Sequence, residues 1–253
     1  MNQTKGKLHI RRLQALFAAG VLAVGFGLAP VADATPLTII SVVGGVPVGT
    51  GNTYENFDSL ALNQHTGTFL TGSGIDVTFA PDAQAVQGAS SGLYAAPFLS
   101  NSNGVLFGDN SVSGADTTTY LAAGSTGSNP GAQVMLELPT SARYMGLLWG
   151  SVDLYNTLTF FNGSNLIGTI TGGQINAFAN GDQGEQGTFY VNINSTEGFD
   201  KVIATSSEQT FEFDNVAFNA VPFRVPEPRI AVMFLFGLLL VGSARLLRGR
   251  RLG

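Results

Sequence analysis

The last 29 residues, Val225 to Gly253, determine which part of this chain can belong to a globular fold. An apolar run of 15 residues without a charge extends from Ile230 to Ala244. At about 1.5 Å per residue, a helix of this length spans roughly 22 Å, short of the ~30 Å hydrocarbon core of a bilayer. Extension to Leu247, with Arg245 snorkelling to the interface, closes most of the difference. We therefore predict a single transmembrane helix over residues 230–247, with a buried core helix as the alternative.

The segments on either side of this run differ sharply in chemistry. Before it stands the triplet Pro226-Glu227-Pro228, whose prolines lack amide protons and keep the backbone from Val225 onward extended. After it comes an arginine-rich tail made of Arg245, Arg248, Arg250 and Arg251. The positive-inside rule places these arginines in the cytoplasm, where they act as a stop-transfer anchor. The extended triplet then lies on the outer side, open to a membrane protease.

The order of these three parts resembles the PEP-CTERM sorting domain of bacterial proteins that exosortases process. The resemblance covers residues 225–253, about a tenth of the chain, and rests on the motif Val225-Pro226-Glu227-Pro228. It implies transient anchoring in the inner membrane, followed by exosortase cleavage and release of the protein toward the cell surface. It also implies a Gram-negative-type host, often one that makes extracellular polysaccharide.

The N-terminal end has the pattern of a signal peptide. The basic residues Lys5, Lys7, Arg11 and Arg12 precede an apolar stretch from Leu13 to Leu28. Ala32-Asp33-Ala34 fits the small-x-small rule, which predicts cleavage between Ala34 and Thr35 by signal peptidase after passage through the secretion translocon. The alternative is an uncleaved N-terminal anchor. Residues 1–34 and 225–253 are therefore left out of the fold prediction.

The remaining body, residues 35–224, is strongly acidic. It holds three of the chain's 12 basic residues and 15 of its 17 acidic ones, a balance of −12. Nucleic acids and anionic membrane surfaces require clustered Lys and Arg, so this balance argues against both as partners. The chain has no cysteine, so burial alone must hold its core together. About 190 residues suffice for that.

The body reads as an all-β exported domain. Short runs rich in β-branched and aromatic residues alternate with turn residues, and Asn162-Gly163 between two of them predicts a hairpin. The spacing predicts a β-sandwich of jelly-roll type. Residues 81–103 are ambiguous, and 122–131 read as a flexible connection. The predicted strands are 37–43, 75–79, 134–138, 144–149, 158–161, 166–170, 189–193, 201–205 and 211–218.

The C-terminal half of the body is similar to a family of exosortase-dependent surface proteins. In that family a Trp-Gly-Ser-x-Asp-x-Tyr-Asn segment precedes a Phe-x-Asn-Gly hairpin, and a Phe-Asp-Asn strand closes the domain. The resemblance covers about 90 residues and implies no catalytic activity. The matching residues are Trp149, Gly150, Ser151, Asp153, Tyr155, Asn156, Phe161, Asn162, Gly163, Phe213, Asp214 and Asn215.

Catalytic patterns are scarce in the body. Its one histidine, His65, stands in a Gly/Thr-rich loop with no Gly-x-Ser-x-Gly elbow elsewhere to pair with it. Thiol chemistry is excluded by the absence of cysteine. A glycosidase needs two carboxylates, and the sequence neither selects nor excludes such a pair. We therefore expect a protein that is not an enzyme, with a glycan hydrolase as the least favoured reading.

Two non-catalytic sites are predicted. Tyr155, with Asp153 and Asn156 beside it, combines an aromatic ring with polar groups that suit saccharide hydroxyls; Trp149 is read as a core residue. Glu55 and Asp58 near the start of the body, with Asp214 near its end, supply oxygens for calcium if the first and last strands are neighbours. Ordinary solvated carboxylates are the alternative to calcium.

Together these patterns predict an exported protein of the cell surface or extracellular matrix. Its expected role is structural or adhesive and non-enzymatic, after transient anchoring in the inner membrane. The alternative role is a carbohydrate-binding module for extracellular polysaccharide.

Overall fold

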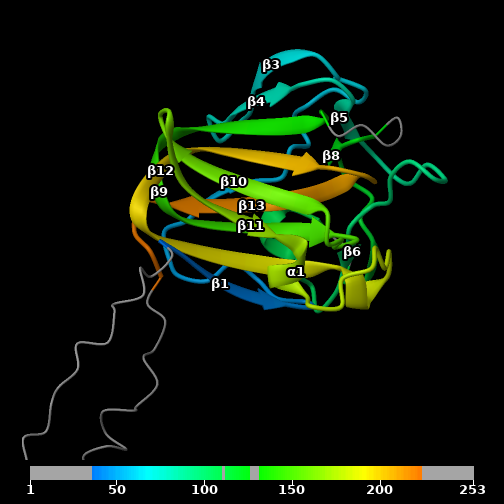
Figure 1. Cartoon of the computed structure of the whole chain (residues 1–253). Coiled ribbons are helices and arrows are strands. Elements are labelled where there is room, and N and C mark those ends of the chain that lie inside the picture. The colour runs from blue at the N-terminus through cyan, green and yellow to red at the C-terminus, as the bar shows by residue number, and fades with distance from the viewer. Residues whose placement is uncertain (1–35, 110–111, 126–130, 224–253) are drawn as a thin grey trace, which may run out of the picture. The chain divides into compact units, whose positions relative to one another are not determined.

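The computed structural model describes residues 36–109, 112–125 and 131–223, and these form an all-β body (Figure 1). Its only α-helix in these ranges is the four-residue α1, Gly172–Ile175, and two 3-10 turns occupy Val105–Phe107 (η1) and Glu185–Gly187 (η2). The strands are β1 Leu37–Val42, β2 Thr53–Glu55, β3 Gly67–Leu70, β4 Asp76–Phe79, β5 Ala83–Val86, β6 Phe98–Leu99, β7 Gly114–Ala115, β8 Tyr120–Ala123, β9 Gln133–Gly150, β10 Asn156–Asn162, β11 Asn165–Thr171, β12 Phe189–Ser206 and β13 Phe211–Asn219.

Two long antiparallel strands, β9 and β12, run through the whole sheet and divide its pairing into two parts. In one part, residues 189–194 of β12 pair with residues 144–149 of β9, flanked by β1 and by β13. In the other part, residues 201–205 of β12 pair with residues 133–137 of β9, flanked by β10–β11 and by β4–β3. The register shifts between Asn194 and Lys201, where β12 passes from one part to the other.

Both parts contribute to the main apolar core, which is consistent with a β-sandwich. Side chains from the first part, such as Leu147 and Val191, belong to the same buried cluster as Leu136 and Phe160 from the second. Trp149 is fully buried and stacks on Phe211, with ring centroids 4.3 Å apart. Its interpretation as a core residue is therefore confirmed.

The face of β8 and β13 that points away from the main core is covered by the segment between β5 and β8. Pro97 in that segment packs so closely on Gly150 of β9 that a Cβ there would lie 3.1 Å from its ring. A small cluster of buried side chains, Val86, Ala96, Tyr120 and Ala122, packs between this segment and the strands β5 and β8. Side chains on this face of β13 are therefore buried, even though they point away from the main core.

All nine predicted strands are present, but the structure adds several that the sequence did not specify. The runs 134–138 and 144–149 belong to one strand, β9, and 189–193 and 201–205 belong to another, β12. The prediction of a flexible connection from residue 122 is wrong at its start, because Ala122 and Ala123 pair with both β5 and β13. The predicted hairpin is confirmed, with Asn162 paired to Asn165.

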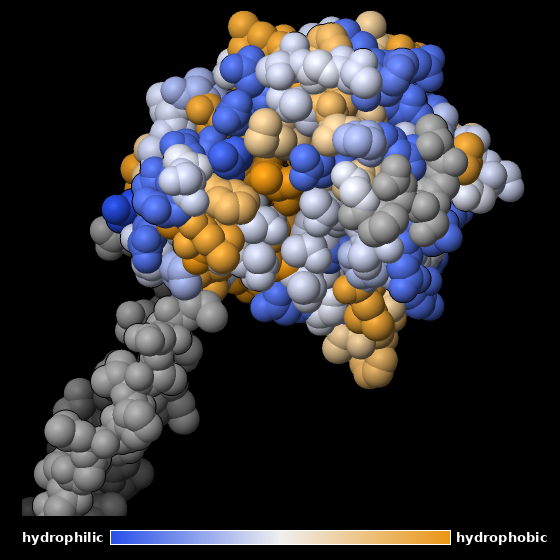
Figure 2. Space-filling model, turned by 45° about the horizontal axis from the view of Figure 1, so that its top comes forward, coloured by the Kyte–Doolittle hydropathy of each residue, from blue (hydrophilic) through white to orange (hydrophobic). Residues whose placement is uncertain are grey.

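The surface of the body mixes polar and apolar residues, and Figure 2 shows its apolar residues as separate groups on one face. No helix in the described ranges is long and apolar enough to cross a membrane. The predicted transmembrane helix, residues 230–247, lies outside those ranges, as does the predicted signal peptide, residues 1–34.

Candidate functional site

A polar pocket of about 180 Å³ lies beside the loop that connects β9 to β10. This loop, residues 151–155, belongs to the Trp-Gly-Ser-x-Asp-x-Tyr-Asn segment and supplies three of its lining residues. Others come from residues 92–94, from the loop before η2, and from the turn into β13. The polar pocket is lined by Gly92, Leu93, Tyr94, Ser151, Asp153, Tyr155, Asn180, Gly181, Gln183, Gln209, Thr210 and Glu212.

Asp153 and Tyr155, two of the three predicted saccharide contacts, lie together in this lining. The Tyr155 hydroxyl donates a 2.5 Å hydrogen bond to Oδ2 of Asp153. The third residue, Asn156, is fully buried and outside the lining; its Oδ1 accepts a 3.1 Å hydrogen bond from the Asp153 amide. Asn156 therefore fixes the loop that presents Asp153 and is not itself a contact residue.

Glu212 of β13 forms the floor of the polar pocket, and no sequence pattern had singled it out. Its side chain is 3% exposed, and its two carboxylate oxygens accept hydrogen bonds from the Ser151 hydroxyl (2.5 Å) and the Ala95 amide (3.0 Å). Burial raises the pKa of Glu212 to about 8. Hydrogen bonds from Ser151 and from the backbone amides of Ala95 and Glu212 itself lower it, and the charge of Asp153 raises it slightly. A large fraction of Glu212 is therefore protonated at neutral pH.

The loop after α1 closes the pocket over Asp153. Gly181 donates its amide to the Val152 carbonyl at 3.1 Å and has a φ of +69°. A Cβ at this position would lie 2.7 Å from Oδ2 of Asp153, so only glycine allows the loop this close. Burial raises the pKa of Asp153 as well, partly offset by the Tyr155 hydrogen bond.

The chemistry of the polar pocket suits a hydroxyl-rich ligand. Carboxyl, amide and hydroxyl groups supply both donors and acceptors, and the rings of Tyr94 and Tyr155 supply flat apolar faces. A protonated Glu212 near Asp153 is also the kind of carboxyl pair that glycoside hydrolysis uses. The site therefore combines the groups of a saccharide-binding pocket with those of an acid pair.

The segments expected to hold calcium do lie side by side. β2 pairs with β13, with Glu55 opposite Val216, which confirms that the start and end of the body are neighbours. Both carboxylate oxygens of Glu55 are taken by backbone amides, those of Phe57 (2.7 Å) and Ser73 (3.1 Å). Glu55 thus holds its own loop in place and is not among the groups that act on Asp214.

The negative charge of Asp58 helps to raise the pKa of Asp214. Asp214 is fully buried, so the alternative of an ordinary solvated carboxylate does not hold for this residue. Strict alternation along β13 would place Val216 on the same side of the strand as Asp214. Instead Val216 joins the main core with Phe213, because a bulge between Asp214 and Ala217 shifts the register. Within the described ranges, no three Asp, Glu, His or Cys side chains converge closely enough to hold a metal ion by themselves.

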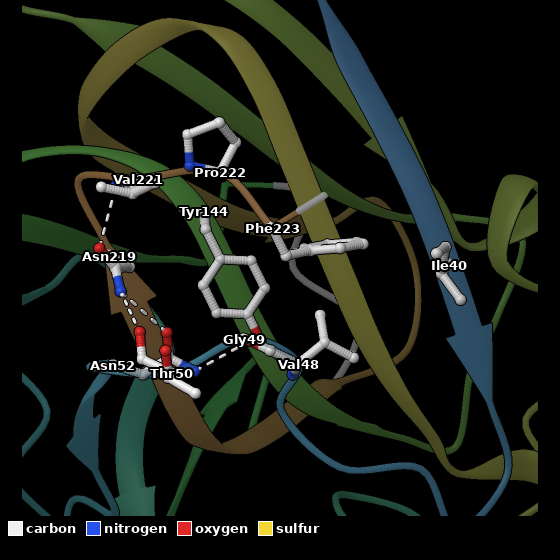
Figure 3. Close-up of a pocket in the computed structure, with 10 residues that line it drawn as sticks. All are labelled: Ile40, Val48, Gly49, Thr50, Asn52, Tyr144, Asn219, Val221, Pro222 and Phe223. Atoms are coloured by element: carbon white, nitrogen blue, oxygen red, sulfur yellow. Dashed lines mark hydrogen bonds between the residues drawn. The ribbon is translucent and has the colours of Figure 1, made fainter. Parts of the chain in front are cut away.

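A second, more apolar pocket of about 440 Å³ lies where the described chain ends (Figure 3). Tyr144 and Phe223 meet edge to face on one side of it, with ring centroids 5.6 Å apart. The side chain of Asn194 accepts a hydrogen bond from the Phe223 amide (3.0 Å) and donates one to its carbonyl (2.7 Å). Phe223, the last described residue, is therefore fixed to β12.

The sorting predictions fall outside the residues that the structure describes. These are the cleavage site at Ala34 and Thr35, the motif Val225 to Pro228 and the arginines at 245, 248, 250 and 251. Comparison with models of protein families, with curated proteins and with solved structures finds no match to this chain.

Proposed function

We propose that this protein is exported and acts at the cell surface or in the extracellular matrix in a structural or adhesive, non-enzymatic role. In this proposal, residues 1–34 direct export through the translocon and are removed by signal peptidase. Residues 225–253 then hold the protein in the inner membrane until an exosortase cleaves at Pro226-Glu227-Pro228.

The observation that carries the proposal is the three-part C-terminus, in which an extended acidic triplet, an apolar run and an arginine tail follow in order. The described fold is compatible with it, since the all-β body extends from β1 at Leu37 to Phe223. A sorted surface protein requires a folded body that does not depend on its two removable ends. In this proposal that body is a jelly-roll.

The test replaces Pro226, Glu227 and Pro228 by alanine in the full-length chain and follows the protein by cell fractionation. Alanines remove the extended backbone and the carboxylate together, so full-length protein should accumulate in the inner membrane. A matched control changes two exposed residues of the β10–β11 hairpin to alanine, Ser164 in the turn and Asn165 at the start of β11. Equal surface release of the triple variant and the control would reject exosortase sorting.

A second candidate function, carbohydrate binding, is favoured by the polar pocket. Its donors, acceptors and two tyrosine rings suit extracellular polysaccharide, and the body's charge of −12 favours a neutral or cation-bridged glycan over an anionic one. A glycan array should then show binding that Tyr155→Phe and Asp153→Asn weaken at least tenfold. Asp200→Asn, a half-buried acid on β12 outside the pocket, serves as the control.

The same assay separates binding from hydrolysis. The non-enzymatic proposal expects bound oligosaccharides to be recovered intact, whatever the protonation of Glu212. Release of new reducing ends that Glu212→Gln abolishes would instead identify a glycan hydrolase. If no glycan on the array binds, the carbohydrate-binding function is rejected and the structural or adhesive role is retained.

A further inference from the structure

Asp214 of β13 is a carboxylate that the protein buries without a donor. Its side chain is 0% exposed, and no described N–H or O–H group makes a well-formed hydrogen bond to either of its oxygens. The Asn215 amide approaches it and lowers its pKa, but less than burial and Asp116 raise it. Buried carboxylates normally find donors, because an isolated charge in the interior costs several kcal/mol.

The side chain that meets Asp214 is a second buried carboxyl, Asp116. Asp116 is 1% exposed, and the two carboxyl groups lie within hydrogen-bonding reach of each other. One oxygen of Asp116 accepts from the amide (2.8 Å) and hydroxyl (2.5 Å) of Thr118, which fixes the side chain in the turn before β8. Its other oxygen has no donor. Three carboxylate oxygens of this pair are therefore left for another group.

More negative charge surrounds the pair. Asp58 acts on Asp214 and Asp109 acts on Asp116, and both raise the pKa of their neighbour. Asp58 is itself tied to this turn, since its Oδ1 accepts a 2.9 Å hydrogen bond from the Thr119 amide. Asp58 and Asp109 thus add negative charge to the surroundings of the buried pair, without converging on it.

The described chain offers no cation of its own to balance them. Its two basic residues are Arg143, which is exposed on β9, and Lys201, whose ammonium lies 5.3 Å from the centre of the Phe161 ring. Neither is among the groups that act on Asp116 or Asp214. A protein with this arrangement either keeps a proton between the two carboxyls or takes up a cation from outside.

We propose that Asp116 and Asp214 form the carboxylate core of a buried calcium site. Calcium accepts six to eight oxygen ligands in flexible geometry, whereas magnesium demands a near-ideal octahedron and zinc favours histidine or cysteine. Because no three acidic side chains converge here, backbone carbonyls, hydroxyls or water complete the coordination. The site differs from the set expected from sequence, since Asp116 replaces Glu55.

A cation at this position connects parts of the chain that are far apart in sequence. Asp214 belongs to the last strand, Asp116 precedes β8, and Asp58 follows β2 and is bonded to the same turn. Calcium therefore stabilises the covering layer over β13, and it does so whether or not the protein is sorted by an exosortase or binds a glycan.

The test uses the full-length protein in detergent, stripped with EGTA and equilibrated with radioactive calcium at pH 7.5. We expect one calcium ion per chain, with affinity at least tenfold lower in Asp116→Asn and in Asp214→Asn. Asp76→Asn, which removes one half-buried charge from β4, should bind as the wild type does. Either substitution also removes the repulsion between the two buried carboxylates, so both variants should fold in EGTA without calcium.

A measurement on the unaltered protein guards against variants that fail to fold. Calcium that binds the native state must raise the thermal midpoint of the wild type above its value in EGTA. Absence of binding at millimolar calcium, with no shift in midpoint, would show that the pair holds a proton and would overturn the proposal. Binding that survives Asp214→Asn would overturn it equally.

Discussion

Ser151 and Glu212 are joined by a 2.5 Å hydrogen bond from the serine hydroxyl to Oε2 of the glutamate. This contact links the residue that follows β9 to the second residue of β13. Ser151 has a φ of +35°, which costs a residue with a side chain of order 1–3 kcal/mol. The polar pocket is therefore built on a strained junction between β9 and β13.

The first prediction concerns the pH dependence of stability. The pKa of Glu212 is about 8 in the folded protein, against 4.5 for an unperturbed glutamate. Between these values the folded state holds a proton that the unfolded state has lost, so the free energy of unfolding falls as pH rises. The slope from this group is at most about 1.4 kcal/mol per pH unit. Urea denaturation in EGTA from pH 5 to pH 8 should show this decline.

The variant Glu212→Gln separates this residue from the other buried acids. Burial also raises the pKa values of Asp116, Asp153 and Asp214, and these contribute in the same direction. Glutamine removes one titration and retains the shape, so the decline should become shallower without disappearing. An unchanged slope in Glu212→Gln would mean that Glu212 ionises normally in the folded state.

The second prediction concerns Gly146, near the C-terminal end of β9. A Cβ at this position would lie 2.6 Å from the hydroxyl oxygen of Tyr144 and 2.7 Å from that of Tyr190. Neither ring is free to move, because Tyr144 donates to Asn192 at 2.7 Å and Tyr190 donates to the Asn215 carbonyl at 3.1 Å. Gly146→Ala should therefore lower the free energy of unfolding by about 1–3 kcal/mol.

Gly72 provides the matched control for this substitution. It precedes β4 and has no heavy atom within 4 Å of an added Cβ. Gly72→Ala should leave the urea midpoint almost unchanged, while Gly146→Ala shifts it downward. Equal midpoints for the two variants would contradict the close packing of the two tyrosines on β9.

The strands with a strong apolar pattern could be predicted because burial and β-propensity agree there. Runs such as Tyr144–Trp149 and Phe189–Ile193 contribute to the buried interior and are rich in β-branched or aromatic residues. The short strands could not be predicted from such a pattern. β8 reads Tyr-Leu-Ala-Ala and leads into a Gly/Ser-rich stretch, and its strand geometry comes from pairing on both sides with β5 and β13.

The candidate sites were predictable only in part, for a similar reason. Tyr155 and Asp153 are neighbours in sequence, so their proximity followed from local spacing. Glu212 and Asp214 alternate with phenylalanines, which predicts correctly that they point away from the main core but not that another layer buries them. That layer, described over residues 88–109 and 112–119, has few apolar residues in regular order, so its position depends on contacts between distant segments.

The third prediction concerns the end of the body. The side chain of Asn194 makes both hydrogen bonds to the backbone of Phe223, the last described residue before Arg224. Asn194→Ala removes both, so the chain after Asn219 should detach more often and trypsin should cleave after Arg224 several-fold faster. Asn165→Ala, at the exposed first residue of β11, is the control. Unchanged cleavage in Asn194→Ala would show that other contacts hold this segment.

The last prediction concerns membrane topology. With the arginines at 245, 248, 250 and 251 in the cytoplasm, a reporter fused after Gly253 should be active only in that compartment. On insertion scales, an arginine at the centre of a membrane helix costs about 2.5–3.5 kcal/mol, so four of them strongly oppose complete translocation. Replacing all four by glutamine should move part of the population to the periplasm and weaken membrane retention. A periplasmic reporter in the wild type would reverse the predicted orientation and place the arginine tail on the outer side.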